Sequence, residues 1–412
     1  MASIGFDIPE DIRTIRDAIE AFVRTEVIAR HERYGNLFSD PRRLYQEDGR
    51  ICDEALALLR DVRMASAKLG YFNMCVPEEI GGAGMGRLAY YVVWEQIYRM
   101  CGAHHWMLGN YVVSHWAFGP SEILLELTPR AREEMLAPML TGEKTMCFGM
   151  SEPGAGSDAA MLKTRAIPDG DGWRLTGRKL WITNAPYADY ILVFAITDPE
   201  RAACKNGGIS VFLVPTDSRG FQIESVVRMF GQIGGDEGAV VLDNVRVEPH
   251  QLVGHLHEGF RIGLLGVSLG RVYNAARSVG FASWALGLAF EYAKIRESFD
   301  HPIGDYQGVT FPLAESAMEV HAAHLMGLNA AMLLDKGHRA IKELSMAKAF
   351  SVEVCLRAIN RAMQTHGAMG FTNEVALAEA WKVVRVINVA DGTNEILRRT
   401  IVQRMLRGDT EI

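Results

Sequence analysis

The sequence has 412 residues, of which 49% are hydrophobic and 23% are charged, a balance typical of soluble globular proteins with two or three packed units. The formal net charge is −7 and no long basic block occurs, which argues against nucleic acid or an anionic membrane as a partner. No run approaches the roughly 18 apolar residues of a membrane helix. Residues 1–11 lack a basic start followed by an apolar core, so we expect no membrane span and no export signal.

Cysteine and histidine usage gives no sign of a metal or redox centre. The six cysteines are scattered, without a CxxC pair or a histidine at ligand spacing. Free thiols in a reducing, cytoplasmic compartment are therefore the expected state. His104, His105 and His115 lack acidic neighbours, so we predict no metal site there.

Residues 1–142 have the spacing of helices. Apolar residues recur at three- and four-residue intervals between Ile12 and Val23. The same pattern returns at Cys52–Leu69, Leu88–Met100 and Ala131–Leu140. We therefore predict an N-terminal helical domain.

Residues 143–257 change to short strands. Runs rich in β-branched and aromatic residues occupy 190–196, 209–214 and 239–242, and each run is bounded by turn-forming residues. Strands that follow one another without helices between them predict an antiparallel sheet or a small barrel, and they exclude a doubly wound nucleotide fold.

Residues 258–412 return to long amphipathic helices, at 260–295, 309–336 and 341–363, which predict an up-down bundle. The chain is thus expected to have an α+β fold, mainly α, with domains at 1–142, 143–257 and 258–412.

One carboxylate lies at a corner of this last domain. Asp391-Gly392 separates two helical runs, 376–388 and 396–406, and Asp-Gly is a turn-forming pair. Thr393 or Asn394 can cap the second helix. The pattern predicts helix, tight turn, helix; taken alone, Asp391 could simply close the turn.

Four further stretches carry polar or glycine-rich patterns. Residues 147–158 combine glycines with serine hydroxyls, which suits a ligand loop or an interdomain connection. Trp181 and Thr183 lie two apart on a predicted strand, so they share one face. Residues 296–299 with Gln307 offer a cation and polar groups suited to a diphosphate. The fourth stretch, 364–371, reads QTHGAMGF.

Each stretch is a weak signal alone, but their order and intervals are specific together. With SEPGAGSD at 151–158, HGAMGF at 366–371 and DGTNEI at 391–396, the chain resembles the acyl-CoA dehydrogenase family of flavoproteins over nearly its whole length. The resemblance implies an N-terminal helical domain, a middle β domain and a C-terminal four-helix bundle in a homotetramer. It also implies FAD as cofactor, an acyl-CoA substrate and an electron-transfer flavoprotein or similar acceptor.

The resemblance also implies roles for individual residues. Asp391 would be the catalytic base, Trp181 would pack on the isoalloxazine, and Thr183 would bond near its N5. The residues implied for FAD are Phe148, Met150, Ser151, Gly156, Ser157, Trp181, Ile182, Thr183, Arg296, Ser298, Phe299, Gln307, Gln364, Gly367, Ala368, Thr393 and Glu395. Those implied for the substrate are Ser157, Ser268 and Arg271, and no metal ligand is implied.

Two positions depart from the family pattern. Most members have Glu where this chain has Asp391, and a minority place the Glu at the position of Gly270. Because Gly270 has no side chain to act as a base, Asp391 is the acid left for the task. Some branches keep Asp at the corner, among them certain long-chain or hydroxyacyl-type dehydrogenases and the nitroalkane oxidases. Gly367-Ala368 also replaces the commoner Gly-Gly.

The expected reaction is α,β-dehydrogenation of an acyl-CoA thioester to a trans-2-enoyl-CoA, with Asp391 removing the α-proton and flavin N5 taking the β-hydride. One alternative is a flavin oxidase or monooxygenase acting on a nitroalkane or a biosynthetic intermediate. A DNA-associated member with little catalysis is another, which the acidic net charge disfavours. Trp106 and Tyr111 either shape a pocket for a short or ring-bearing acyl group or belong to the core.

Overall fold

The computed structural model of the chain describes residues 8–411. Two compact units emerge, one from Met85–Gly109 and the described parts of Met1–Arg33 and Arg271–Ile412, the other from Tyr34–Gly84 and Asn110–Gly270. The three-domain division at residues 142 and 257 stays a prediction. The expectation of no export signal concerns residues 1–11, of which 1–7 lie outside the described residues.

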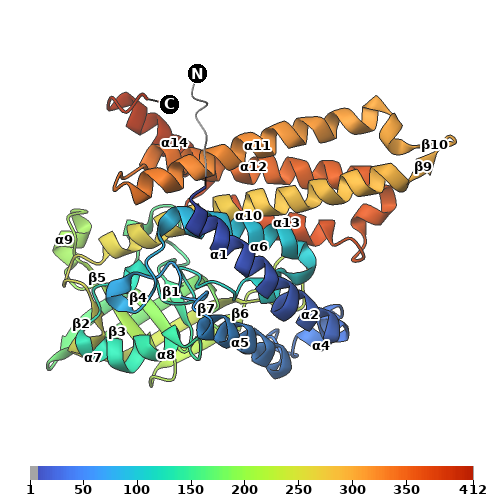
Figure 1. Cartoon of the computed structure of the whole chain (residues 1–412). Helices are drawn as coiled ribbons and strands as arrows, with labels where there is room; N and C mark the ends of the chain where they lie inside the picture. Colours follow the sequence, from blue (N-terminus) through green and yellow to red (C-terminus); the bar gives the residue numbers. More distant parts are fainter. Residues whose placement is uncertain (1–7, 412) are drawn as a thin grey trace. The chain divides into compact units, whose positions relative to one another are not determined.

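The first unit is helical (Figure 1). It contains α1 (Glu10–Phe22), the π-helical η1 (Val23–Ile28), α2 (Ala29–Arg33), α6 (Gly86–Gly109), most of α10 (Phe260–Ile295), α11 (Gln307–Asp335), α12 (Ile341–His366), α13 (Leu377–Ile387) and α14 (Asn394–Leu406). The hairpin β9 (Glu297–Ser298) and β10 (His301–Pro302), with η7 (Ile303–Asp305), links α10 to α11, and η8 (Gly367–Phe371) follows α12. Helix α12 packs against α11, α13 and α14, so it forms the centre of this bundle.

The buried face of α12 follows the expected helical period. Buried residues recur at three- and four-residue spacing from Leu344 through Val352 and Cys355 to Ala362. Lys348 lies on this same face with none of its surface exposed. A lysine in such a position is rare unless it is paired, so its partners bear on function.

Helix α6 extends beyond the predicted 88–100, and its helical backbone is interrupted at Gly102, with φ 49° and ψ −152°. A Cβ at Gly102 would lie 2.1 Å from Cε2 of Trp284 in α10. The glycine therefore permits both the kink and the close approach of the Trp284 ring. Helix α6 includes Trp106 and ends at Gly109, before Tyr111, and Trp116 is buried in the second unit.

The second unit is built on an eight-stranded sheet in the described residues. Its strands are β1 (Met146–Gly149), β2 (Arg165–Asp169), β3 (Gly172–Thr183), β4 (Tyr190–Ile196), β5 (Ile209–Pro215), β6 (Phe221–Val226), β7 (Glu237–Val247) and β8 (Leu252–Val253). Besides the start of α10, the helical segments of this unit are α3 (Gly35–Phe38), α4 (Pro41–Leu44), α5 (Asp53–Lys68), η2 (Glu78–Ile80), η3 (Glu122–Leu124), α7 (Pro129–Ala131), η4 (Arg132–Leu136), α8 (Ala137–Leu140), η5 (Ala159–Met161), α9 (Pro199–Ala203) and η6 (Pro249–Gln251).

The strand order is β6-β7-β3-β2-β4-β5-β8, with β1 also paired to β4. Most pairs are antiparallel, as predicted, but β4 runs parallel to both β1 and β2. Every residue of β4 except the last is buried, as expected for a central strand covered on both faces. The sheet lies in the middle of the sequence between helical segments, which confirms the predicted fold class.

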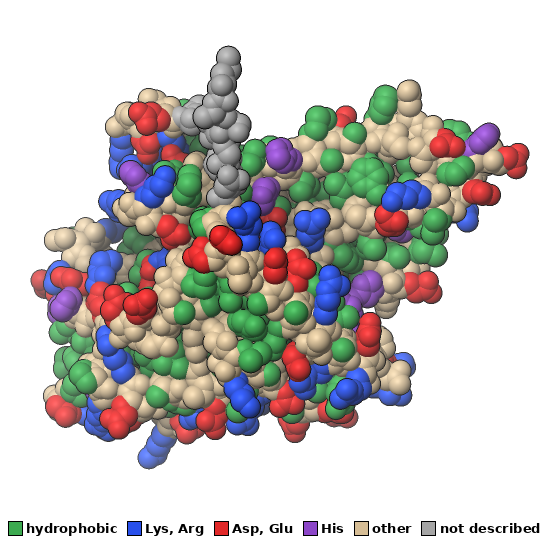
Figure 2. Space-filling view, viewed as in Figure 1, with side chains coloured by type: hydrophobic (Ala, Val, Ile, Leu, Met, Phe, Trp, Pro, Cys, Tyr) green, Lys and Arg blue, Asp and Glu red, His purple; other side chains and the backbone are tan. Residues whose placement is uncertain are grey.

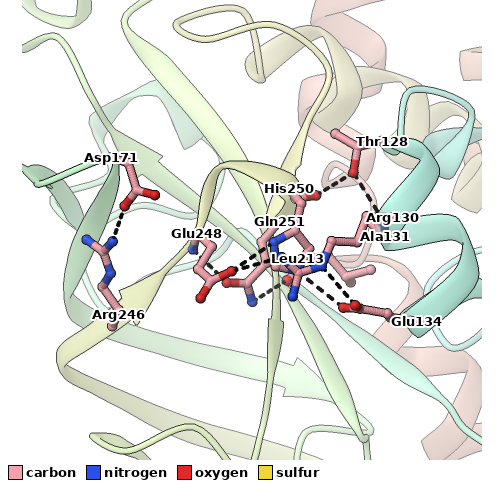
Figure 3. A network of polar contacts seen from close by, with 10 residues as sticks. All are labelled: Thr128, Arg130, Ala131, Glu134, Asp171, Leu213, Arg246, Glu248, His250 and Gln251. Atoms are coloured by element: carbon pink, nitrogen blue, oxygen red, sulfur yellow. Dashed lines mark hydrogen bonds and ion pairs between the residues drawn. The ribbon is translucent and has the colours of Figure 1, made fainter.

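A polar network fixes the segment between β7 and β8 (Figure 3). Arg130 pairs with Glu134 at 2.8 Å and with Glu248 at 3.3 Å. The Gln251 amide donates to the Leu213 carbonyl on β5 at 3.3 Å, and the Thr128 hydroxyl donates to the His250 carbonyl at 2.9 Å. The chain that enters α10 is therefore anchored on the sheet and on the start of α7.

The distribution of charge on the surface is in line with the acidic net charge of the sequence. Acidic and basic side chains are interspersed on the face shown in Figure 2, without a continuous basic area of the kind that nucleic acid requires. In the described part of the chain, no helix is both long and apolar enough to cross a membrane. The six cysteines are free thiols, as predicted.

Substituting Gly102 with Ala should destabilise the protein by several kcal/mol, because the added methyl group would overlap the Trp284 ring and the backbone has a positive φ. Gly287→Ala is the control: Gly287 lies within the long helix α10, and nothing lies within 4 Å of a Cβ there. The control should be neutral or gain up to about 1 kcal/mol. Urea unfolding of both variants tests this, and equal stabilities would contradict the packing described for Gly102.

Candidate active site

The corner after α13 has the predicted form of helix, turn, helix. Asp391 and Gly392 have φ values of 53° and 92°, so two successive residues take the left-handed conformation that Gly and Asp tolerate best. The Thr393 hydroxyl accepts from the Ile396 amide at 3.2 Å and caps α14. Glu395 is exposed in the first turn of α14.

Lys348 secures this corner from α12. Its ammonium donates to the Gly392 carbonyl at 3.0 Å and to Asn394 Oδ1 at 3.1 Å. The Asn394 amide in turn donates to Asn388 Oδ1 at 2.7 Å, across the turn. A buried cation thus binds the backbone immediately after Asp391.

Helix α10 approaches the same corner with two polar residues. The Asn274 amide donates to Asp391 Oδ2 at 2.7 Å, and Arg271 Nε donates to the Asp391 carbonyl at 3.1 Å. Arg277 lies one turn further along α10, where its guanidinium donates to the Tyr273 hydroxyl at 3.2 Å. Within residues 8–411, the carboxylate therefore has one neutral donor in contact, and cations lie around it.

At this corner, burial and the neighbouring charges shift the pKa of Asp391 in opposite directions. Burial raises the pKa of Asp391 to about 6, against the lowering effects of Lys348, Arg271, Arg277 and the Asn274 hydrogen bond. Burial lowers the pKa of Lys348, although the negative charge of Asp391 favours its protonated form. A carboxylate whose pKa lies near neutrality is suited to exchange protons with a substrate.

In the second unit, Trp181 stands out from β3. The pairing of β3 with β7 shifts between Lys179 and Ile182, and Trp181 has a φ of 63°, which is strained for a bulky residue. Its side chain is 56% exposed. Thr183 is half-buried and Ile182 is fully buried in the core, so Trp181 and Thr183 both lie on the side away from the core.

A buried ion pair joins this strand to the 147–158 loop. Lys179 Nζ lies 2.9 Å from Glu152 Oε1 and donates to the Phe194 carbonyl at 2.7 Å. Glu152 also accepts from the Lys163 amide at 2.6 Å and the Thr164 amide at 3.0 Å. Because every partner is satisfied, the pair fixes the loop beside β3.

The loop itself has room for a ligand. The Leu180 amide of β3 donates to the Ser151 carbonyl at 3.0 Å. A Cβ at Gly154 or Gly156 would have nothing within 4 Å, and Ser157 is exposed. Phe148 and Met150 instead point into aromatic and apolar packing, with the Phe148 ring 4.9 Å from that of Phe194. An exposed indole beside an open glycine loop fits a planar aromatic cofactor such as a flavin.

The remaining residues implied for FAD belong to the first unit, at the far end of its bundle. Arg296 and Ser298 follow α10, Phe299 is the 87% exposed tip of the β9–β10 hairpin, and Gln307 begins α11. At the end of α12 lie Gln364, Gly367 and Ala368. Stacking of the Tyr292 ring on His366, with centroids 4.4 Å apart, brings the ends of α10 and α12 together.

This far group is distant from the Asp391 corner of the same chain. Lys348 contacts the corner, and His366 marks the far end of α12; eighteen residues of helix span about 27 Å. The two substrate candidates on α10, Ser268 and Arg271, lie three residues apart, and Arg271 contacts the corner.

Four residues of these clusters were missed by the sequence interpretation: Glu152, Lys179, Asn274 and Lys348. A polar side chain within an apolar helical face was a usable signal for Lys348, because it lies four residues from Leu344 and from Val352. Asn274 stands among buried apolar residues in the same way.

Comparison with known proteins matches three family models in succession along the chain. They are the acyl-CoA dehydrogenase N-terminal domain at residues 9–143, the middle domain at 147–245 and the C-terminal domain at 257–406. The chain belongs to the acyl-CoA dehydrogenase family and is an FAD-dependent oxidoreductase. This confirms the family indicated by the sequence motifs.

Individual relatives extend over most of the chain. The chain is 36% identical to a 3-(aryl)acrylate reductase of Clostridium sporogenes, over 86% of this chain and 92% of the relative. It is 33% identical to the caffeyl-CoA reductase-Etf complex subunit CarC of Acetobacterium woodii, over 83% and 88%. The structure of butyryl-CoA dehydrogenase from Megasphaera elsdenii shares the fold, with a TM-score of 0.83 and 24% identity over 98% and 100%.

Substituting Glu152 with Ala should destabilise the protein by about 3–5 kcal/mol, because Lys179 would remain buried without its counter-ion. The control is Lys205→Ala, which removes an exposed pair with Asp158 and should cost less than about 1 kcal/mol. Chemical unfolding of the two variants measures the difference. A Glu152→Ala protein as stable as the control would contradict a structural role for the buried pair.

Proposed function

We propose that this protein catalyses the FAD-dependent α,β-dehydrogenation of an acyl-CoA thioester to a trans-2-enoyl-CoA, with Asp391 as the base. Bound FAD would supply the acceptor for the β-hydride. The observation that carries the proposal is the Asp391 carboxylate at the α13–α14 corner, at the family's base position, with its pKa raised toward neutrality.

The raised pKa suits an aspartate to the role of the base. An α-proton of a thioester is weakly acidic, and a base is most effective when its pKa lies near the operating pH. A shift from 3.8 to about 6 increases the proton affinity of Asp391 on the order of a hundred-fold, while most of the population stays ionised at neutral pH.

Two neighbours of Asp391 hold the backbone of the turn in place. Lys348 holds the turn at the Gly392 carbonyl, and Arg271 holds the Asp391 carbonyl. Both cations thus bind backbone oxygens, so the carboxylate remains available to a proton. Asp is one methylene, about 1.5 Å, shorter than the Glu of most family members. The positions of its backbone and of the substrate therefore decide whether the carboxylate reaches the α-proton.

For the cofactor, we propose that Ser151, Ser157, Trp181 and Thr183 line the flavin. The exposed Trp181 ring and the open Gly154 and Gly156 support this. We further propose that the group around Arg296 and Gln364 binds the FAD of a partner subunit in a homotetramer. Its distance along α12 from the corner of its own chain supports this, as do the exposed apolar side chains of Ile295, Phe299 and Phe311.

A second candidate function is the reverse reaction, reduction of an aryl-substituted acrylate or its CoA thioester. The observation that favours it is that two relatives above 30% identity are named as reductases of aryl-type substrates. In that direction protonated Asp391 would deliver the α-proton, and a pKa of about 6 serves both directions. We propose an electron-transfer flavoprotein as the redox partner, since one relative is named as part of an Etf complex.

Two assays separate the two directions. The first offers straight-chain, branched and arylpropionyl-CoA thioesters with an electron-transfer flavoprotein as acceptor. The second offers the matching enoyl compounds with the reduced acceptor. Substrate-dependent oxygen consumption without reduction of the flavoprotein acceptor would instead identify an oxidase or monooxygenase and contradict the proposal.

Asp391→Asn should lower the rate of anaerobic flavin reduction by the best thioester about a thousand-fold, because the amide cannot accept the α-proton. FAD should remain bound, which its absorption spectrum reports. Asp17→Asn, at an exposed carboxylate of the same unit, is the control and should reduce at the wild-type rate. Full flavin bleaching in Asp391→Asn would refute the assignment of the base.

The second-order rate constant for flavin reduction should rise with pH through about 6 and then level off, because the base must be ionised. Folding raises this pKa, so the ionisation of Asp391 disfavours the folded state as pH rises through about 6. Stopped-flow reduction between pH 5 and pH 8 measures the profile. A rate that falls over this range would contradict a carboxylate base.

A further inference from the structure

Asn274 donates a hydrogen bond to the Asp391 carboxylate, at 2.7 Å from its amide nitrogen to Oδ2. We propose that Asn274 is a positioning residue: it fixes the short Asp391 side chain in the orientation that a proton transfer requires, and the two side chains form a pair matched in length. This inference rests on the proposed role of Asp391 as the base.

Asn274 is an unusual residue for its place in the fold. It is 2% exposed on α10, and the neighbouring Val272, Ala275 and Ala276 are buried apolar residues. Its side-chain oxygen is buried and has no hydrogen-bond partner in the described residues. An unsatisfied buried oxygen destabilises the folded state. The contact with Asp391 is therefore the interaction that accounts for an amide at this position.

The other polar groups at the corner do not replace this contact. The hydrogen bonds of Lys348 go to the Gly392 carbonyl and to Asn394, and that of Arg271 goes to the Asp391 carbonyl. These bonds fix the backbone of the turn, and the orientation of the carboxylate is left to Asn274. A neutral amide also lowers the pKa of its carboxylate partner less than a contacting cation would, so a base held by Asn274 keeps its affinity for a proton.

The same contact sets the length of the side chain at position 391. A Glu would extend about 1.5 Å further along the present direction, where the Asn274 amide already lies 2.7 Å from the carboxylate oxygen. A longer base must therefore turn away from its present line. Shortening the side chain at 274 should make room for it.

The charged groups that face the carboxylate are Lys348 from α12 and Arg271 and Arg277 from α10. All three lower its pKa, as does the hydrogen bond from Asn274. Removal of the Asn274 amide leaves the three cations in place. The effect on the pH profile can then be attributed to the lost hydrogen bond.

The test uses the FAD-loaded protein and the acyl-CoA thioester that reduces wild-type flavin fastest, followed by stopped flow at several pH values. Asn274→Ala and Asn274→Leu should lower the limiting rate about ten- to a hundred-fold, as a misplaced reacting group does, with little change in the substrate concentration at half-saturation. The midpoint of the pH profile should move upward, because a donor to the ionised form is lost. Asn274→Leu keeps the branched shape of the side chain and removes the unsatisfied oxygen, so it should fold even where Asn274→Ala is unstable.

A double-mutant cycle tests the length matching. Asp391→Glu alone should be slow, and Asp391→Glu combined with Asn274→Ala should be faster than Asp391→Glu by about ten-fold, although each single change lowers the rate. Ser345→Ala is the control for a buried polar residue, because its hydroxyl bonds within α12 to the Ile341 carbonyl. It should leave rate and pH midpoint unchanged.

Wild-type rates and an unchanged pH midpoint in both Asn274 variants, with Asp391→Asn inactive, would overturn the role of Asn274 and leave the proposed function intact. Additive losses in the cycle would overturn the length matching. A fully active Asp391→Asn would refute the proposed function itself, so the two failures are distinguishable.

Discussion

The central constraint in this protein is the cost of keeping a carboxylate ionised at a turn that is partly shielded from water. Burial disfavours the charge of Asp391, and three nearby cations favour it. The balance leaves a pKa near 6, at which the group can both take up and release a proton. The side chains that bind the corner come from two long helices: Lys348 from α12, and Arg271 and Asn274 from α10.

A comparable arrangement organises the sheet unit. There the buried pair of Glu152 and Lys179 has all its partners satisfied, so it holds a loop and a strand in fixed register. The strained backbone of Trp181 lies two residues after Lys179 and leaves the indole exposed. Each unit thus uses one buried lysine to stabilise the backbone beside the residue proposed to do chemistry or bind the flavin.

The sequence predicted what depends on local pattern. The bounds of β4 and α10 and the start of α12 followed from spacing, whereas α12 continues to His366, three residues beyond the predicted end at 363. Turn chemistry left the cap of α14 open between Thr393 and Asn394, and in the structure Thr393 is the cap. The kink at Gly102, the parallel pairing of β4 and the partners of Asp391 did not. Asn274 and Asp391 are 117 residues apart, and a contact at that separation leaves no periodic signal in one sequence. The motifs supplied the family, and the family supplied roles for the site residues that spacing alone left open.

Hydrogen exchange at the substrate α-carbon tests directly whether Asp391 is the base. Incubation of the FAD-loaded protein with a saturated acyl-CoA thioester in deuterium oxide, followed by mass spectrometry, measures proton removal independently of the electron acceptor. We expect deuterium incorporation by the wild-type protein and none above background by Asp391→Asn. Equal incorporation by the two proteins would contradict this role of Asp391.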